Sequence, residues 1–285
     1  MSKSIKKIDG QDFLRKAKIR EKKLKEIKRE IEEYGTVERN RIPTNIKIYC
    51  AEHKQQNCDS IDKEDKPVIQ KIEIYYANNR RRVIKWFENG QKKYEKWYID
   101  GVYHREDGPA IQWWFENGQK ENELWYKNGE IHREDGPAIQ WWFENGQNKY
   151  NIWYKNGEYH REDGPAYQNW FENGQKSFDY WFLNGLNHRE DGPAIQDWYK
   201  DGQKRYNIWY VESLVQGFRE DGPVYQDWYK DGQKSSNEWY INGQKKYEKW
   251  YKNGQKKYEK WYLDNLLHRE DGPAYQDWYK DGQKR

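Results

Sequence analysis

The stretch Trp86-Phe87-Glu88-Asn89-Gly90 shows the pattern that governs most of the chain. From Trp86 onward, a Trp-Tyr or Trp-Phe pair, one further residue and then Asn-Gly or Asp-Gly recur many times. The tryptophans are separated alternately by 11 and 17 residues, which gives a 28-residue period. Late in the chain, three steps of 11 lead from Trp228 to Trp261, so the short unit can be added without the long one. Each unit is therefore structurally modular.

The repeated Asn-Gly and Asp-Gly pairs favour strands joined by tight turns. A type I′ hairpin turn needs positive φ at both central residues, and such turns at every unit forbid long helices. The flanking Trp, Tyr and Ile residues favour strands, and alternation places each Trp and the aromatic residue after it on opposite faces. We predict an all-β repeat protein over residues 86–285, an elongated antiparallel sheet of tandem β-hairpins with aromatic rows. The alternative is a β-solenoid with one coil per repeat.

The 17-residue unit carries a second motif, His-Arg-Glu-Asp-Gly-Pro-Ala, at 104–110, 132–138, 160–166, 188–194 and 268–274, with a variant at 218–224. Asp-Gly-Pro is typical of turns: we expect Gly to adopt an unusual φ and Pro to interrupt the ladder. Five near-identical copies indicate a structural role, with Arg and carboxylates pairing between neighbouring repeats. The residues assigned this structural role are His104, His132, His160, His188, His268, Gly108, Gly136, Gly164, Gly192, Gly222 and Gly272.

Catalysis and metal binding fit this repetition poorly. In a meander, equivalent histidines would lie ~10 Å or more apart, too far to share a zinc ion; only a solenoid would stack them at ~4.8 Å. Cys50, His53 and Cys58 are zinc-ligand types without a convincing fourth ligand. No phosphate loop, nucleophile elbow, zinc-protease helix or kinase signature occurs. We expect no enzymatic activity, no metal and no cofactor.

Two tryptophans depart from the repeat and are candidate binding residues. The position before the closing Trp of the long unit is polar in four repeats, which indicates a water-facing site: Asn169, Asp197, Asp227 and Asp277. In the first two repeats it is Trp113 and Trp141. Exposed tryptophans in consecutive repeats can bind a protein, a sugar ring or a base. The alternative is that the N-terminal helix packs over them.

The N-terminal region differs from the repeats. Residues 1–40 form a charged segment in which 11–34 has a heptad-like apolar spacing, and Gly35 is a natural helix end. This helix could cap the repeat array, self-associate as a coiled coil, or bind a membrane surface through its basic side chains. Residues 41–85 contain strand-like runs and read as a degenerate lead-in to the repeats.

Composition limits the remaining options. Charged residues make up 35% of the chain and hydrophobic residues only 34%, yet 17 Trp, 25 Tyr and 8 Phe supply enough area for a thin structure. The net charge of +4 comes from residues 1–34, with twelve Lys/Arg and seven Asp/Glu, so the repeats carry no strong nucleic-acid signal. Two cysteines and no long apolar run lead us to expect a soluble, intracellular protein.

The repeats resemble the MORN-variant repeat, a short aromatic strand, an Asn-Gly turn and a return strand, as in Trp239-Tyr240-Ile241-Asn242-Gly243-Gln244-Lys245-Lys246-Tyr247. His-Arg-Glu-Asp-Gly-Pro-Ala looks like a form common in repeat proteins of giant DNA viruses, which would place the chain in a host cytoplasm or a virion. The resemblance implies a twisted sheet of hairpins and a role in protein or membrane association; some bacterial relatives are regarded as antitoxins. The glycine-rich unit of standard MORN repeats is absent, which weakens the lipid-binding role.

The function that follows is a non-enzymatic scaffold for protein–protein interaction. Self-association through residues 11–34 or through the C-terminal sheet edge is one expected route to assembly. The alternatives are an aromatic platform for a glycan or another ligand, an antitoxin-like protein that binds a toxin, and peripheral membrane association through the basic helix.

Overall fold

The computed structural model describes residues 21–23, 25–27, 29, 43–50, 69–211, 214–215, 222–241 and 244–285. The chain forms two compact units, Met1–Glu130 and Ile131–Arg285. Both are built from β-strands, and the described residues between 21 and 29 are helical. The predicted all-β class with an N-terminal helix is therefore confirmed. Among the described residues, no helix is both long and apolar enough to span a membrane.

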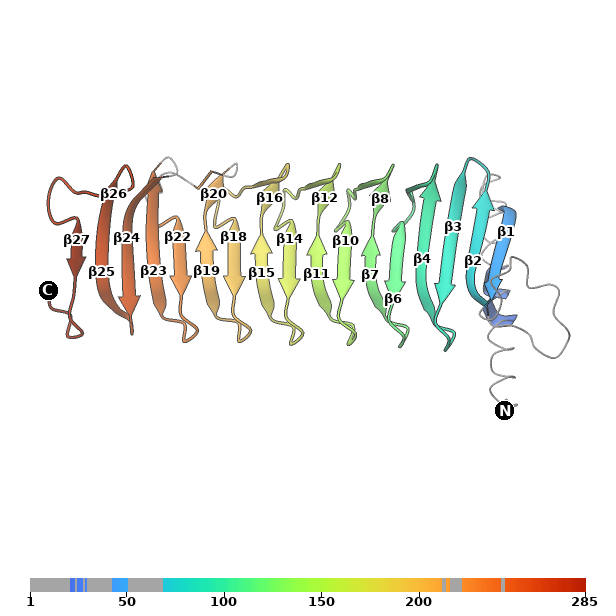
Figure 1. Cartoon of the computed structure of the whole chain (residues 1–285), viewed down its shortest axis with the longest axis horizontal. Coiled ribbons are helices and arrows are strands. Elements are labelled where there is room, and N and C mark those ends of the chain that lie inside the picture. The colour runs from blue at the N-terminus through green and yellow to red at the C-terminus, as the bar shows by residue number, and fades with distance from the viewer. Residues whose placement is uncertain are drawn as a thin grey trace, which may run out of the picture. The chain divides into compact units, whose positions relative to one another are not determined.

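The first unit is an antiparallel meander in which strands pair in chain order (Figure 1). Its strands are β1 (Pro43–Cys50), β2 (Ile69–Tyr76), β3 (Arg80–Trp86), β4 (Lys92–Ile99), β5 (Val102–Tyr103), β6 (Ile111–Trp114), β7 (Lys120–Leu124) and β8 (Tyr126–Lys127). The two-residue strand β5 folds back on the end of β4, so β4 pairs with β3, β5 and β6. Strand β9 (Glu130–Ile131) falls at the boundary between the units.

The second unit repeats the same arrangement. The main strands, which pair in the order given, are β10 (Ile139–Trp142), β11 (Asn148–Ile152), β14 (Tyr167–Trp170), β15 (Lys176–Tyr180), β18 (Ile195–Trp198), β19 (Lys204–Ile208), β22 (Tyr225–Trp228), β23 (Lys234–Ile241), β24 (Gln244–Lys252), β25 (Gln255–Leu263) and β27 (Tyr275–Asp277). Short strands form side hairpins: β12 (Tyr154–Lys155), β13 (Glu158–Tyr159), β16 (Phe182–Leu183), β17 (Leu186–Asn187), β20 (Tyr210–Val211), β21 (Leu214–Val215) and β26 (Leu266–Leu267). All pairings are antiparallel, so the sheet is a hairpin meander and the solenoid alternative is wrong.

One set of turns follows the predicted type I′ geometry. At Asn156-Gly157 both central residues have positive φ, 51° and 79°, and the turn joins the short strands β12 and β13. The pairs at 100–101, 128–129, 184–185 and 253–254 share this conformation. Asparagine and glycine are the residues that reach it at the lowest cost.

A second set of turns differs from the prediction. At Asn173-Gly174 only the glycine has positive φ, and its N–H donates to the carbonyl of Phe171 at 2.9 Å. The ladder between β14 and β15 shifts by one residue at Trp170. Because this bulge absorbs an extra residue, the loop closes as a type I turn followed by one left-handed glycine. The prediction of a type I′ turn at every unit is therefore wrong.

Among the residues that the structure describes, the aliphatic core lies at the N-terminal end of the first unit. Its buried residues are Ile27, Ile69, Ile72, Ile74, Ile84 and Trp86. The helix reaches this core through Ile27 and through Lys23, whose ammonium donates to the Ile69 carbonyl at 3.2 Å and lies 4.9 Å from the Trp86 ring centre. Burial lowers the pKa of Lys23 to about 8. The described helical residues thus pack on the lead-in strands, as a cap would.

The predictions for the rest of residues 1–42, for the zinc-ligand types His53 and Cys58, and for the side chain of Cys50 lie outside the described residues.

Beyond the N-terminal core, the fully buried apolar positions of the repeats are small. They are Ala110, Ala138, Ala166, Ala194 and Val224, each 0% exposed. Each alanine ends the His-Arg-Glu-Asp-Gly-Pro-Ala motif, and the carbonyl of Ala166 accepts a hydrogen bond from the Trp153 N–H at 2.7 Å.

Candidate binding face

The charged motif His-Arg-Glu-Asp-Gly-Pro-Ala forms a loop whose arginine makes most of its hydrogen bonds to other residues of the same motif. In the copy at 160–166, Arg161 donates from Nε to Asp163 Oδ1 at 2.8 Å and from Nη1 to the Pro165 carbonyl at 3.3 Å. Its guanidinium carbon lies 4.0 Å from the ring centre of Trp153. The same Arg–Asp bond occurs at Arg105, Arg133, Arg189 and Arg269. Arginine and aspartate therefore pair inside one motif, and the prediction that they pair between repeats is wrong.

The motif glycines have a different role from the one predicted. The described ones, Gly108, Gly136, Gly164, Gly192, Gly222 and Gly272, do not have positive φ. In the copy at 160–166 the guanidinium of Arg161 lies over the glycine: a Cβ placed on Gly164 would be 2.8 Å from Arg161 Cζ. The corresponding distances at Gly108, Gly136, Gly192 and Gly272 are 2.8–3.4 Å. A side chain at Gly164 would therefore displace the arginine, whereas a Cβ on Gly222 would have nothing within 4 Å.

The histidines link successive repeats through hydrogen bonds. The backbone N–H of Asn156 donates to His132 Nδ1 at 3.1 Å, and the equivalent bonds reach His104 at 2.9 Å and His160 at 3.3 Å. The backbone N–H groups of His188 and His268 donate to Trp181 and Trp261. Among the described residues, no group of three or more His, Cys, Asp or Glu could hold a metal.

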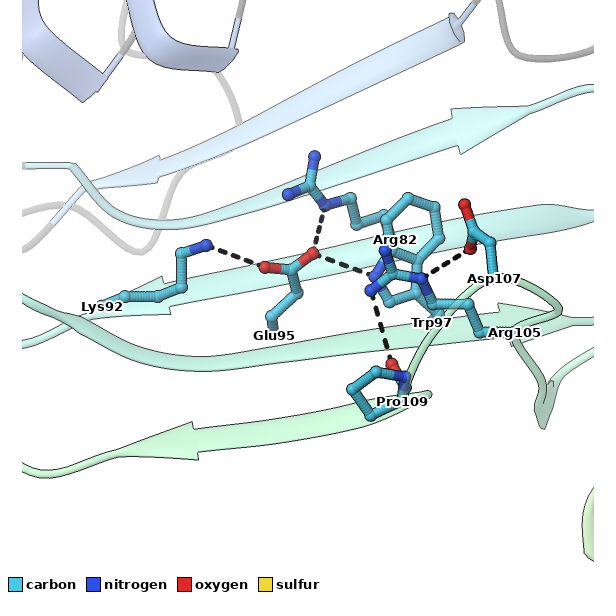
Figure 2. Close-up of polar contacts among 7 residues, drawn as sticks. All are labelled: Arg82, Lys92, Glu95, Trp97, Arg105, Asp107 and Pro109. Atoms are coloured by element: carbon cyan, nitrogen blue, oxygen red, sulfur yellow. Dashed lines mark hydrogen bonds and ion pairs between the residues drawn. The ribbon is translucent and has the colours of Figure 1, made fainter. Parts of the chain in front are cut away.

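A buried ionic cluster occupies the same face in the first unit (Figure 2). Glu95 accepts from Arg82 Nε at 2.8 Å, from Lys92 Nζ at 2.8 Å and from Trp97 Nε1 at 2.9 Å. Burial alone would raise the pKa of Glu95, but the two cations outweigh it and lower the pKa to about 2. Arg105 stacks on the Trp97 ring at 4.7 Å, which joins this cluster to the motif loop.

We call the face that carries these motif arginines and their tryptophans the arginine–tryptophan face. Its indole rings are covered from within the chain: Arg189 lies 4.1 Å from the Trp181 ring centre, and Lys176 and Lys204 lie 5.9 and 5.8 Å from two closing tryptophans. A hollow of about 660 Å³ lies between the loops at 161–165 and 188–191, with Trp181 and Leu183 in its wall. The arginines that line it are already bonded to their own aspartates.

The opposite face of each sheet carries the two predicted tryptophans. Both are half-buried. Trp113 contacts the Tyr94 ring at 4.9 Å, and the Lys96 ammonium lies 5.1 Å from its centre. Trp141 stacks on Tyr150 at 5.5 Å with 27° between the planes. Trp113 and Trp86 lie on opposite faces because Lys85, Tyr94 and Trp113 are aligned across the ladder, so the described helical residues do not cover Trp113.

In the second unit this side forms a continuous aromatic face, defined by Trp141, Tyr150, Tyr159, Tyr167, Phe178, Tyr180, Phe182, Tyr206 and Tyr225. Tyr167 is at its centre and contacts four of these rings, the nearest being Phe178 at 4.7 Å. The rings are half-buried. Burial raises the pKa of Tyr150 to about 12, so its hydroxyl is neutral at pH 7.

Sequence reasoning found Trp141 on this face and missed the tyrosines around it. A usable signal was present, because an aromatic residue lies three positions after the glutamine of most Gly-Gln pairs, as at Tyr150, Phe178 and Tyr206. The ladder places that residue directly opposite the one before the closing Trp. The prediction that the latter position faces water is wrong for Asp197, which is only 8% exposed.

Comparison with known proteins adds no assignment. No family model matches the chain, and no curated protein matches it in sequence. The class that the fold defines is an open antiparallel repeat sheet with one aromatic face and one arginine–tryptophan face.

Proposed function

We propose that this protein is a non-enzymatic scaffold that binds a protein partner through the aromatic face of its second unit. The observation that carries the proposal is the set of half-buried rings on one face of the sheet between Trp141 and Tyr225. Tyrosine and tryptophan offer large contact area and lose little side-chain entropy on binding, and they dominate protein-binding surfaces. The resemblance to MORN-variant repeats points in the same direction.

The contrast between the two faces supports this choice. On the arginine–tryptophan face, cations of the chain itself cover the rings, and the motif's carboxylates are bonded to its arginines. On the aromatic face, Trp141, Tyr150 and Tyr167 contact one another mainly through their rings and leave part of their surface to solvent. The two faces therefore differ in that motif arginines cap Trp153 and Trp181, whereas Tyr150 and Tyr167 contact other rings.

Peptide-display selection against the immobilised full chain tests the proposal. We expect enriched peptides whose affinity drops at least tenfold for a variant with Tyr150→Ser, Tyr167→Ser and Tyr206→Ser. The matched control replaces Phe143 and Phe171, which lie in the turns, and should bind the peptides normally. Thermal unfolding must show that both variants fold. Peptides that bind the ring variant as well as the wild type would refute the assignment of the face.

Self-association is a second candidate, favoured by the apolar residues near the edge strand β27. Leu266 is 72% exposed, Leu267 54% and Tyr275 46%. Exposed apolar side chains beside a strand can associate with a second copy. Light scattering of the full chain should then show an oligomer that Leu266→Lys with Tyr275→Lys converts to a monomer; a wild-type monomer would exclude this candidate.

A further inference from the structure

Asp197, Asp227 and Asp277 all stand just before the closing Trp of the long unit. They differ in the hydrogen bonds and ion pairs that their carboxylates make. Asp227 accepts hydrogen bonds from the Trp228 N–H and from Ser235 Oγ, both at 3.0 Å. Asp277 lies 3.7 Å from a guanidinium nitrogen of Arg285. Asp197 is more than nine-tenths buried, at 8% exposed, and its Oδ1 has no hydrogen-bond partner among the described residues. Asp197 is thus the one of the three with a buried carboxylate oxygen that accepts no hydrogen bond from the described residues, although the hydroxyls of Tyr180 and Tyr206 act on its carboxylate.

The surroundings of Asp197 are aromatic. On the adjacent strands its cross-strand neighbours are Phe178 and Tyr206. The hydroxyls of Tyr180 and Tyr206 lie 3.4 Å apart. Burial raises the pKa of Asp197, and the two tyrosine hydroxyls and Arg205 offset only part of that effect. A carboxylate in such a place is costly until a cation approaches it.

The first unit shows a cation in the equivalent place. Strands β4 and β6 match β15 and β18 in register, so Lys96 has the position of Tyr180, and Trp113 that of Asp197. The Lys96 ammonium lies 5.0 Å from the Tyr94 ring centre and 5.1 Å from that of Trp113. This face of the repeat therefore accommodates an ammonium group among rings. In the second unit the rings are joined by a carboxylate, and no lysine occupies the site.

We propose that Asp197, Tyr180 and Tyr206 form a receptor for a lysine or arginine side chain of the protein partner. The inference rests on the proposed function, since the partner delivers the side chain by binding to the aromatic face. The carboxylate supplies the charge and the two rings supply cation–π contacts. Arg205 lies at the margin, with its guanidinium carbon 5.6 Å from the Tyr206 ring centre. A partner with a basic side chain at this point gains affinity and a defined register along the sheet.

The test uses the full chain with n-butylammonium as the probe and 1-butanol as its uncharged match, followed by NMR of tyrosine-labelled protein. We expect saturable shifts of the Tyr180 and Tyr206 ring signals with butylammonium and not with butanol. Asp197→Asn keeps the shape of the side chain and should weaken binding at least fivefold. Asp227→Asn, at the equivalent position of the next repeat, should bind as the wild type does.

Two outcomes would overturn the receptor: equal shifts with butylammonium and butanol, or unchanged butylammonium binding by Asp197→Asn. A melting temperature of Asp197→Asn equal to or above that of the wild type will verify that this variant is folded. The peptides from the display selection separate this result from the proposed function. If peptides that lose affinity for the triple tyrosine variant bind Asp197→Asn as tightly as the wild type, the aromatic face remains a binding face and the receptor is refuted. Butylammonium binding at Asp197 without any ring-dependent peptide would show a cation site, but it would remove the protein-binding role and with it the assignment of the site to a protein partner.

Discussion

Single residues explain why the motif recurs with so little variation. Arg161 pairs with Asp163, bonds the Pro165 carbonyl, stacks on Trp153 and packs against Gly164. One planar guanidinium satisfies all four relations, which an ammonium cannot do because it lacks the fork and the flat face. By contrast, Glu162 in the same motif is mostly solvent-exposed.

We therefore predict that Arg161→Lys destabilises the second unit by about 1 kcal/mol, the order of a partly desolvated cation–π contact. Glu162→Gln is the matched control and should change stability little, because the side chain of Glu162 is 77% exposed. Urea unfolding monitored by tryptophan fluorescence measures both. Equal stability of the lysine variant and the wild type would contradict the role given to the guanidinium.

Glu95 predicts how the first unit responds to acid. Its pKa is lowered from 4.5 to about 2 in the folded state. As the pH falls, this carboxylate is therefore protonated in the unfolded state before it is protonated in the folded state. The stabilisation is complete above the unfolded pKa and is lost as the pH falls from about 4.5 through 2. We expect Glu95→Gln to be less stable than the wild type at pH 7, on the order of 2 kcal/mol, and the gap to narrow towards pH 2. Denaturant midpoints measured across this range would show a constant gap if the prediction is wrong.

At the scale of elements, the turns divide the hairpins into two kinds. The side hairpin of β12 and β13 uses two left-handed residues, whereas the loop between β14 and β15 uses a bulge at Trp170 and one left-handed glycine. The dipeptide Asn-Gly occurs in both kinds of turn. In the second kind, asparagine contributes through its side chain, because Asn173 Oδ1 accepts a hydrogen bond from the Gln175 N–H. Local sequence predicts a turn at each place, and the strand pairing around it decides the type.

Gly157 allows the turn effect to be measured apart from packing. Its φ is 79°, and a Cβ placed on it would have nothing within 4 Å. Gly157→Ala should cost about 1 kcal/mol through backbone strain alone, and Gly157→Asn should cost less, since asparagine tolerates the left-handed region. Thermal unfolding of the two variants checks the order. Asparagine costing as much as alanine would show that the strain argument fails.

Much of the fold and a part of the candidate site could be predicted from such patterns. The period and the Asn-Gly pairs predicted antiparallel hairpins, and Trp141 was found because it departs from the repeat. Tyr150 and Phe178 were missed because their neighbours depend on the ladder register, which a one-residue bulge shifts. The glycines of the charged motif were assigned to φ, whereas Gly164 is required by a side chain that folds back over it.

At the scale of the whole molecule, the described residues of the second unit form no aliphatic core like that of the first, and their pairings repeat with the same register from β14–β15 to β18–β19. Stability is then close to a sum of repeat and nearest-neighbour contributions. The alanine that closes each motif is fully buried at Ala166 and again at Ala194. A complete repeat can therefore be removed without exposing an interface that the remaining repeats cannot cover.

We predict that deletion of residues 167–194, which joins Ala166 to Ile195 across one 28-residue period, leaves a folded protein. Its calorimetric unfolding enthalpy near 60 °C should fall by about 20 kcal/mol. Deletion of residues 167–180 is the control: it removes a hairpin out of phase with the repeat and should aggregate or lose cooperative unfolding. Failure of the in-phase deletion to fold would contradict modularity.

The sequence alone determined that this chain is a repeat of antiparallel hairpins, because glycine-containing turns and alternating aromatic residues act within a few positions of each other. Only the tertiary structure decided which rings share a face, which arginine covers which tryptophan, and that one carboxylate oxygen of Asp197 is buried without a hydrogen bond from the described residues. Those relations join residues on different strands. They depend on register and on the bulge at each closing tryptophan, and no local pattern specifies either.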